Sequence, residues 1–168
     1  MKTALLVLMF GVLLLPHRTS HEFPNLLICG VLSALAFQFR TDVRPELFSY
    51  LFLTLFLVIT SRCLRKDDDR LLYVLPVIML FWVNMHGFFV LGLVVLIFAL
   101  IEALLRKNTL QLKKIAGVLF ICVCALWLNP FGADAVFFPF EQFYMLREGS
   151  FFLNIRELIP TLSFAGAY

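Results

Sequence analysis

The chain has 168 residues, of which 62% are hydrophobic, and its mean hydropathy is +0.95. A soluble domain is about 45–50% apolar, and a chain of this length cannot bury so much apolar surface in a water-soluble core. The composition therefore excludes an ordinary soluble domain. The apolar runs are continuous rather than alternating, so they predict an all-α, polytopic transmembrane helical bundle.

The net charge of +3 does not indicate a nucleic-acid partner, because basic and aromatic residues do not interleave on a polar surface. Eight of the fourteen Lys and Arg instead form two clusters, which are Arg62, Arg65, Lys66 and Arg70, then Arg106, Lys107, Lys113 and Lys114. Cytoplasmic loops collect Lys and Arg, so both clusters are expected on the inner side of a membrane. The chain must then cross the membrane twice between them.

Six apolar segments are predicted to span the membrane. In chain order they are residues 4–15, 23–39, 47–60, 71–83, 88–105 and 115–128. Most are shorter than the roughly 20 residues of an untilted span, so flanking residues must snorkel or the bilayer must thin locally. Residues 1–135 would form the transmembrane region. Residues 136–168 mix aromatic, acidic and proline residues, which favours an outer-face interfacial segment, expected to be truncated.

The first segment has two interpretations. With both basic clusters inside, six crossings place Met1 outside, although Lys2 would favour the inner side. Lys2 followed by an apolar stretch is also typical of a secretory signal peptide, but no A-x-A cleavage site follows it. The other interpretation, which we prefer, is that earlier segments of a longer chain are missing.

The same topology brings three polar motifs to the outer face, and they are Arg40-Thr41-Asp42-Val43-Arg44-Pro45-Glu46, Asn84-Met85-His86-Gly87 and Asn129-Pro130-Phe131-Gly132-Ala133-Asp134. Polar groups at membrane depth are costly and usually face a cavity or a partner, so the motifs could line one pocket. Each also has a structural explanation. Arg44-Pro45-Glu46 suits a helix start, the second motif suits helix caps around a tight turn, and Asn129-Pro130 suits a helix stop.

Other candidates for chemistry are weaker. The four cysteines (Cys29, Cys63, Cys122 and Cys124) lie mostly within apolar stretches and are expected to pack rather than to bind metal. Glu102 and Arg106 have the spacing of an ordinary ion pair on one helix face. No metal site is indicated by the sequence.

Three motifs in order carry a family resemblance, and they are Arg44-Pro45-Glu46-Leu47-Phe48-Ser49, Trp82-Val83-Asn84-Met85-His86-Gly87 and Leu128-Asn129-Pro130-Phe131-Gly132. Over residues 40–135 the chain resembles bacterial multispanning membrane glycosyltransferases of the GT-C class, which use polyprenyl-phosphate sugars. The likeness lies in the order and spacing of the motifs. Phe88 stands where relatives often have a second glycine, which leaves the turn less flexible.

The resemblance implies sugar transfer at the outer face of the bacterial inner membrane, with the lipid bilayer and a polyprenyl-phosphate-linked sugar donor as partners. It implies that Arg44 and His86 bind the donor, supported by Arg40, Asn84 and Asn129, and sometimes by a divalent metal. Arg suits this role because its planar fork meets two phosphate oxygens at once. Relatives carry their acidic base in an earlier outer loop that has no equivalent here. The catalytic base is therefore unknown, and this chain alone is expected to be inactive.

Two other classes of function remain open. A component that transports a lipid or small anion should have polar groups near the bilayer midplane, whereas here they lie at the predicted outer ends. A non-catalytic membrane assembly subunit would need no site at all. In that case substitutions of Arg44 or His86 would affect folding but no reaction.

Overall fold

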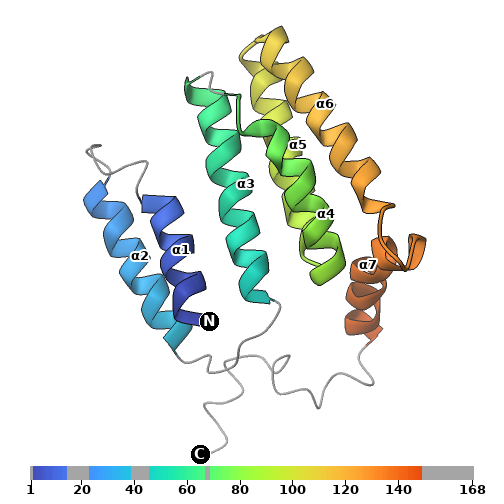
Figure 1. Cartoon of the computed structure of the whole chain (residues 1–168), viewed down its shortest axis with the longest axis horizontal. Coiled ribbons are helices and arrows are strands. Elements are labelled where there is room, and N and C mark those ends of the chain that lie inside the picture. The colour runs from blue at the N-terminus through green and yellow to red at the C-terminus, as the bar shows by residue number, and fades with distance from the viewer. Residues whose placement is uncertain (1, 15–22, 39–45, 67–68, 149–168) are drawn as a thin grey trace, which may run out of the picture.

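The computed structural model describes residues 2–14, 23–38, 46–66 and 69–148. All regular structure in these ranges is helical, as the sequence predicts, and Figure 1 shows the arrangement. The helices are α1 (Lys2–Leu14), α2 (Phe23–Gln38), α3 (Glu46–Lys66), the short 3₁₀ helix η2 (Leu72–Val74), α4 (Leu75–Met85), α5 (Phe89–Leu105), α6 (Thr109–Leu126) and α7 (Ala133–Glu148).

Two helices extend well past the apolar segments from which they are predicted. Helix α3 runs on to Lys66, and α6 begins at Thr109. Their extra turns are polar, so hydropathy marks the apolar part of each helix and not its ends. Of the described helices, two have the length and apolar character needed to cross a membrane, Glu46–Arg65 and Thr109–Leu126, while four other apolar helices have 10–17 residues.

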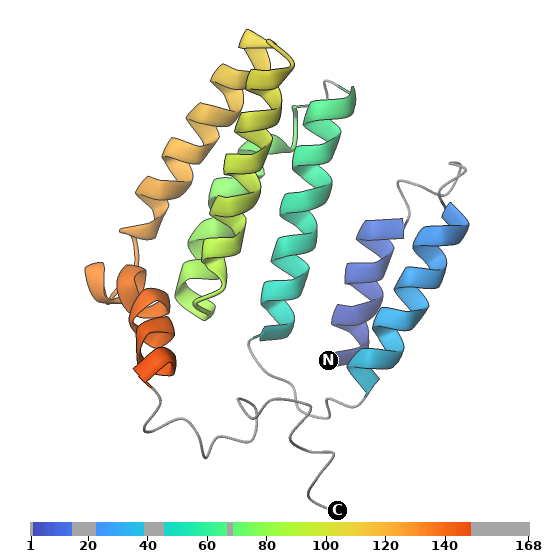
Figure 2. The ribbon, with the colours of Figure 1, turned by 180° about the vertical axis from the view of Figure 1, so that it is seen from behind.

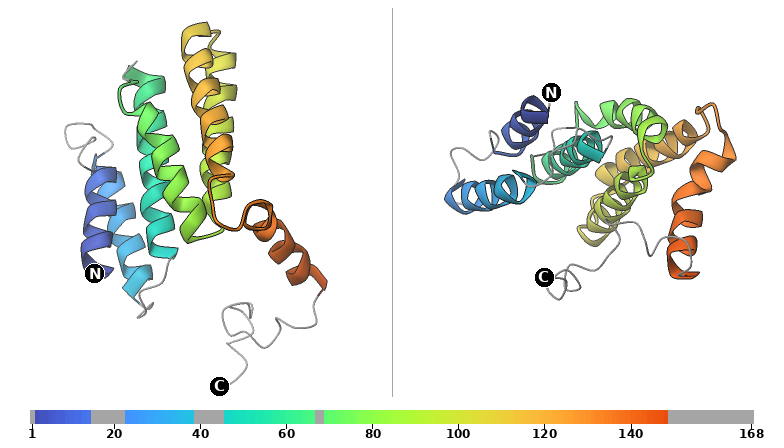
Figure 3. Two further views of the ribbon diagram at one scale, coloured as in Figure 1. Left: turned by 45° about the vertical axis from the view of Figure 1, so that its right-hand side comes forward. Right: turned by 90° about the horizontal axis from the view of Figure 1, so that it is seen from below.

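The helices run up and down in an antiparallel array, as Figures 1 and 2 show from opposite sides. Helix α5 packs against α3 and α6, and α4 packs mainly against α6, so these four helices enclose one core. Helices α1 and α2 form a hairpin at the side of this bundle, where α1 contacts α3. Helix α7 turns away from the bundle direction, as Figure 3 shows.

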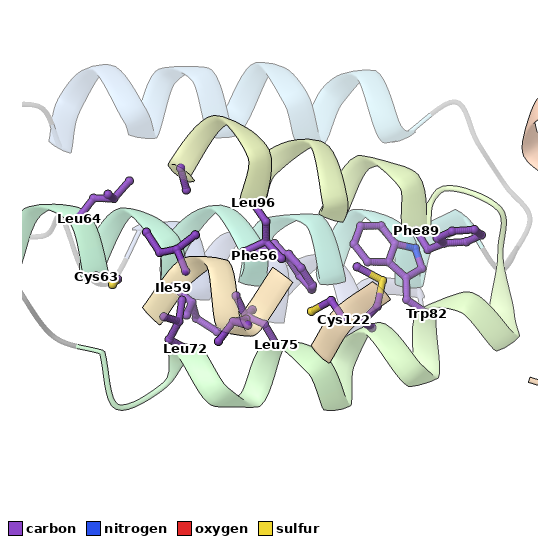
Figure 4. Close-up of a cluster of buried hydrophobic side chains, with 14 of the residues drawn as sticks. Phe56, Ile59, Cys63, Leu64, Leu72, Leu75, Trp82, Phe89, Leu96 and Cys122 are labelled. Carbon is purple, nitrogen blue, oxygen red and sulfur yellow. The ribbon is translucent and has the colours of Figure 1, made fainter. Parts of the chain in front are cut away.

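The core contains side chains from all four central helices (Figure 4). Trp82 of α4 is fully buried and lies near Phe52 and Phe56 of α3, with ring centroids 5.8 and 5.6 Å away. Offset and edge-on aromatic pairs of this kind add to the packing energy beyond the area they bury. This aromatic cluster therefore fixes α4 against α3.

Gly92 allows α5 to approach this cluster. A Cβ at Gly92 would lie 2.9 Å from Trp82 Cζ3, 3.1 Å from Met79 Cε and 3.2 Å from Phe56 Cε1. Such contacts are shorter than packed carbon atoms tolerate. Small residues at helix interfaces let backbones come close, which is how helices commonly associate in membranes. Position 92 therefore requires glycine for packing.

The two ends of the bundle differ in chemistry. We call the end where α3 finishes and α6 begins the basic end, because both predicted basic clusters lie there. We call the opposite end, where α3 begins and α4 and α6 finish, the motif end.

The α5–α6 turn at the basic end is tight and well capped. Lys107 has a left-handed backbone with φ 55°, while the Asn108 N–H donates to the Ala103 carbonyl at 3.1 Å and the Lys107 N–H donates to the Leu104 carbonyl at 3.0 Å. These two bonds define a Schellman motif, in which the left-handed position usually holds glycine. The Asn108 side chain then accepts from the Gln111 N–H and caps α6.

Candidate functional site

The motif end contains every described residue that the sequence predicts for a site. Asn84 and His86 lie where α4 gives way to α5, and Asn129 follows the end of α6. Arg40 and Arg44 lie outside the described residues. The structure does describe Glu46, the last residue of their motif, which opens α3 at the same end.

His86 ends α4 and has an extended backbone, with its N–H donating to the Trp82 carbonyl at 3.0 Å. Its Nδ1 accepts a hydrogen bond from the Phe88 N–H at 3.3 Å, and its ring lies edge-on to the Phe88 ring at 4.4 Å. A neutral imidazole whose Nδ1 accepts must carry its proton on Nε2. The half-buried His86 side chain therefore has Nε2–H as its hydrogen-bond donor.

Both asparagines bond to the backbone of their own turns. Asn84 Nδ2 donates to the Leu80 carbonyl at 2.7 Å, one helical turn back. Asn129 Nδ2 donates to the Leu126 and Gly132 carbonyls at 2.8 and 3.3 Å, while its Oδ1 accepts from the Phe131 N–H at 2.8 Å. Asn129 thus closes the α6–α7 turn with both its Nδ2 and its Oδ1 atoms. This is the helix-stop role that the sequence indicates for it.

Ser49 and Trp82, which belong to the first two motifs of the family resemblance but are not predicted as site residues, connect these motifs. The fully buried Trp82 indole donates from Nε1 to Oγ of Ser49 at 2.9 Å, and Ser49 is itself 2% exposed. Ser49 closes the first motif and Trp82 opens the second, so one hydrogen bond joins segments 33 residues apart. A buried tryptophan normally needs a partner for its N–H. The sequence therefore predicts that the Trp82 N–H has a hydrogen-bond acceptor, but it does not identify the acceptor as Ser49.

Helix α7 packs on the turn that carries His86. A Cβ placed on Gly87 would lie 3.2 Å from Cγ of Pro139, so α7 approaches this turn closely. The α4 and α7 helices are in contact at this end, and Figure 3 shows α7 beside the α4–α5 turn. Substitution of Gly87 would therefore shift α7, the α4–α5 turn, or both.

Two carboxylates at the motif end lie at the starts of helices. Glu46 lies in the first turn of α3 and Asp134 in the first turn of α7, where carboxylates complement the helix dipole. Within the described ranges, no group of three or more His, Cys, Asp or Glu side chains could hold a metal ion. Of the site residues predicted from the sequence and described by the structure, His86 is the one whose side chain has a hydrogen-bond donor not used within its own turn.

Comparison with protein-family models, curated proteins and solved structures gives no match to this chain. The relevant features are the Ser49–Trp82 bond, the half-buried His86 side chain and the turn closed by Asn129.

Proposed function

We propose that the chain is a six-span part of a bacterial inner-membrane glycosyltransferase of the GT-C type. In this proposal it binds a polyprenyl-phosphate-linked sugar at the outer face. The supporting observation is that one buried hydrogen bond, Trp82 to Ser49, holds the His86 turn against the start of α3. Arg44 lies two residues before that start, so a basic residue and a hydrogen-bond donor belong to adjoining segments.

The apolar exterior supports membrane insertion of α1 to α6. Large apolar side chains project outward along these helices, including Phe98 at 67% exposed and Phe120 at 70% exposed. Soluble monomers rarely expose apolar surface on this scale. With the basic end inside by the distribution of Lys and Arg, the motif end faces outward.

The chemistry follows from the leaving group. An acceptor hydroxyl oxygen attacks the anomeric carbon of the sugar, and the bond to the phosphate oxygen breaks with its electron pair. Arg44, with Arg40, would neutralise the charge that builds on the phosphate, and His86 Nε2–H would donate one hydrogen bond to it. Asn84 and Asn129 would act indirectly, by shaping the two turns. We assign no residue of this chain as the base that takes the hydroxyl proton.

The test uses native mass spectrometry of the purified full chain. It compares the retention of a polyprenyl phosphate with the retention of the uncharged polyprenol of equal length. Arg44→Ala and His86→Ala should each weaken retention about tenfold or more, because each removes a hydrogen bond to a charged group. Lys2→Ala is the matched control, since Lys2 is a basic residue at the start of α1 and belongs to none of the three motifs. Equal retention of phosphate and alcohol, or unchanged retention in both variants, would contradict the proposal.

A non-catalytic assembly subunit is the second candidate function. The observation that favours it is the use of Asn84 and Asn129 to close their own turns. A subunit of this kind would retain phosphate and alcohol alike. Transport of a lipid or anion is less favoured, because the described polar residues Asn84, His86 and Asn129 lie at helix ends rather than at the middle of the bundle.

Membrane topology has a separate test. In a variant whose exposed Cys29 and Cys124 are changed to Ala, Asp134→Cys should react with a membrane-impermeant maleimide in intact spheroplasts. Lys107→Cys should react only after lysis, because the two positions lie at opposite ends of the bundle. Labelling of both positions in intact spheroplasts would overturn the six-span arrangement.

A further inference from the structure

Hydrogen bonds join the two basic clusters at the basic end. The clusters are 36 residues apart in sequence, counted from Arg70 to Arg106. Arg106 Nη1 donates to the Leu64 carbonyl of α3 at 3.1 Å, which places Arg106 and Lys107 beside Arg65. Lys114 donates a hydrogen bond to Asp69, which places Lys113 and Lys114 beside Arg70. The tertiary structure therefore makes one surface from two clusters.

The described acidic groups at this end are already paired. Glu102 binds Arg106 Nη2 at 2.5 Å, and Asp69 binds Lys114. Among the described residues, no carboxylate lies within ion-pair distance of the exposed Arg65, Arg70, Lys107 or Lys113. We call these four residues the basic surface. Residues 62–114 contain eight Lys and Arg but four Asp and Glu. The net charge of this stretch is therefore positive even when every carboxylate is ionised.

The surface is also held in shape. Gln111 Nε2 donates to the Cys63 carbonyl at 2.9 Å, so Gln111 and Arg106 both cap the last turn of α3. Helix C-termini have unsatisfied carbonyls, and these two side chains supply donors from α5 and α6. Lys107 sits at the left-handed position of the α5–α6 turn, which fixes where its side chain leaves the backbone.

We propose that the basic surface binds the phosphate headgroups of anionic membrane lipids on the inner side. The inference rests on the membrane placement in the proposed function and not on sugar transfer. Arginine forks pair with phosphate oxygens two at a time, and lysines add point charges. Basic residues next to the cytoplasmic ends of membrane helices each strengthen binding to anionic lipid by about 1 kcal/mol, or about fivefold. Zwitterionic lipid lacks the net charge that this surface needs.

The experiment uses the full chain in a neutral detergent, with a short-chain phosphatidylglycerol as the probe and phosphatidylcholine of equal chain length as the control lipid. Binding is read by native mass spectrometry, and separately from the rise in thermal midpoint as lipid is added. Phosphatidylglycerol should bind and stabilise, with weaker binding at high salt. The double variant Arg65→Gln, Lys113→Gln should weaken binding on the order of 25-fold.

The matched control is Lys2→Gln with Arg147→Gln, which removes two cations from α1 and α7 near the motif end and should leave phosphatidylglycerol binding unchanged. Equal binding of the two lipids, or an unaffected double variant, would overturn the proposal. If inorganic phosphate alone competes fully, the ligand is free phosphate and the lipid assignment is wrong. The thermal midpoint without lipid shows that each variant is folded. If the unsubstituted chain binds phosphatidylglycerol but does not retain polyprenyl phosphate, the result counts against the proposed function and not against the basic surface.

Discussion

The Trp82 indole N–H donates to Ser49 Oγ over 2.9 Å, and both groups are buried between α3 and α4. The Trp82 carbonyl also accepts the N–H of His86, so the same residue holds the end of α4. Trp82 therefore connects the start of α3 with the turn that carries His86. This connection makes the residue a point at which packing and the proposed site depend on each other.

Ser49→Ala should lower the free energy of unfolding by about 1–3 kcal/mol, because it leaves the buried indole N–H of Trp82 with no acceptor. The thermal midpoint of the purified chain in one detergent gives the measurement. Ser61→Ala is the matched control, since Ser61 lies on the same helix but is exposed. Equal midpoints for the two variants would show that the Ser49–Trp82 bond adds nothing to stability.

Gly92→Ala should destabilise the bundle by about 1–3 kcal/mol, because the added methyl would overlap Trp82 and Phe56. Gly117→Ala provides the contrast on α6, since a Cβ there has no atom within 4 Å. Alanine is the better helix former, so Gly117→Ala should be neutral or stabilise by up to about 1 kcal/mol. Thermal midpoints of the two variants should therefore move apart, and a parallel shift would refute the packing argument.

Lys107→Gly should raise the free energy of unfolding by roughly 1 kcal/mol, which is measured as a higher thermal midpoint in lipid-free detergent. The reason is that φ 55° strains a lysine backbone but not a glycine. Lys113→Gly is the control, because Lys113 lies inside α6, where glycine costs about 0.8–1.0 kcal/mol. A lower midpoint for Lys107→Gly would mean that the lysine side chain itself stabilises the turn.

Stability at acidic pH should depend on the Asp69–Lys114 pair. The hydrogen bond from Lys114 holds the pKa of the Asp69 carboxyl below its ordinary value of 3.8. A folded-state pKa below the unfolded one means that the pair stabilises the fold above about pH 4, and that this contribution is lost as the pH falls through the folded-state value.

Lys114→Met should therefore flatten the decline in thermal midpoint as the pH falls from about 5 to below 3. Lys113→Met removes a neighbouring exposed cation without touching Asp69 and should keep the wild-type slope. Indistinguishable slopes for wild type and Lys114→Met would show that Asp69 is not paired in solution.

Hydropathy and charge were enough to predict that the chain is helical and where its apolar segments lie. They also predicted that Asn84 and His86 share one end with Asn129, because parity of crossings depends only on the order of apolar and basic stretches. The helix ends were less predictable. The last turn of α3 and the first turns of α6 are polar, and their helical bonds continue past the point where hydropathy falls.

By itself, the sequence determined the apolar periodicity, the two basic clusters and the candidate polar residues, since composition and local patterning carry that information. Only the tertiary structure decided that Ser49 accepts from Trp82, that Gly92 lies against Trp82, and that Arg106 caps α3. Each of these contacts joins segments far apart in the chain or on different helices, and the partner of a buried donor depends on how helices pack rather than on its neighbours in sequence. The helix-stop role of Asn129, by contrast, was open to prediction from the sequence, because its amide bonds to the carbonyls of Leu126 and Gly132, each three residues away.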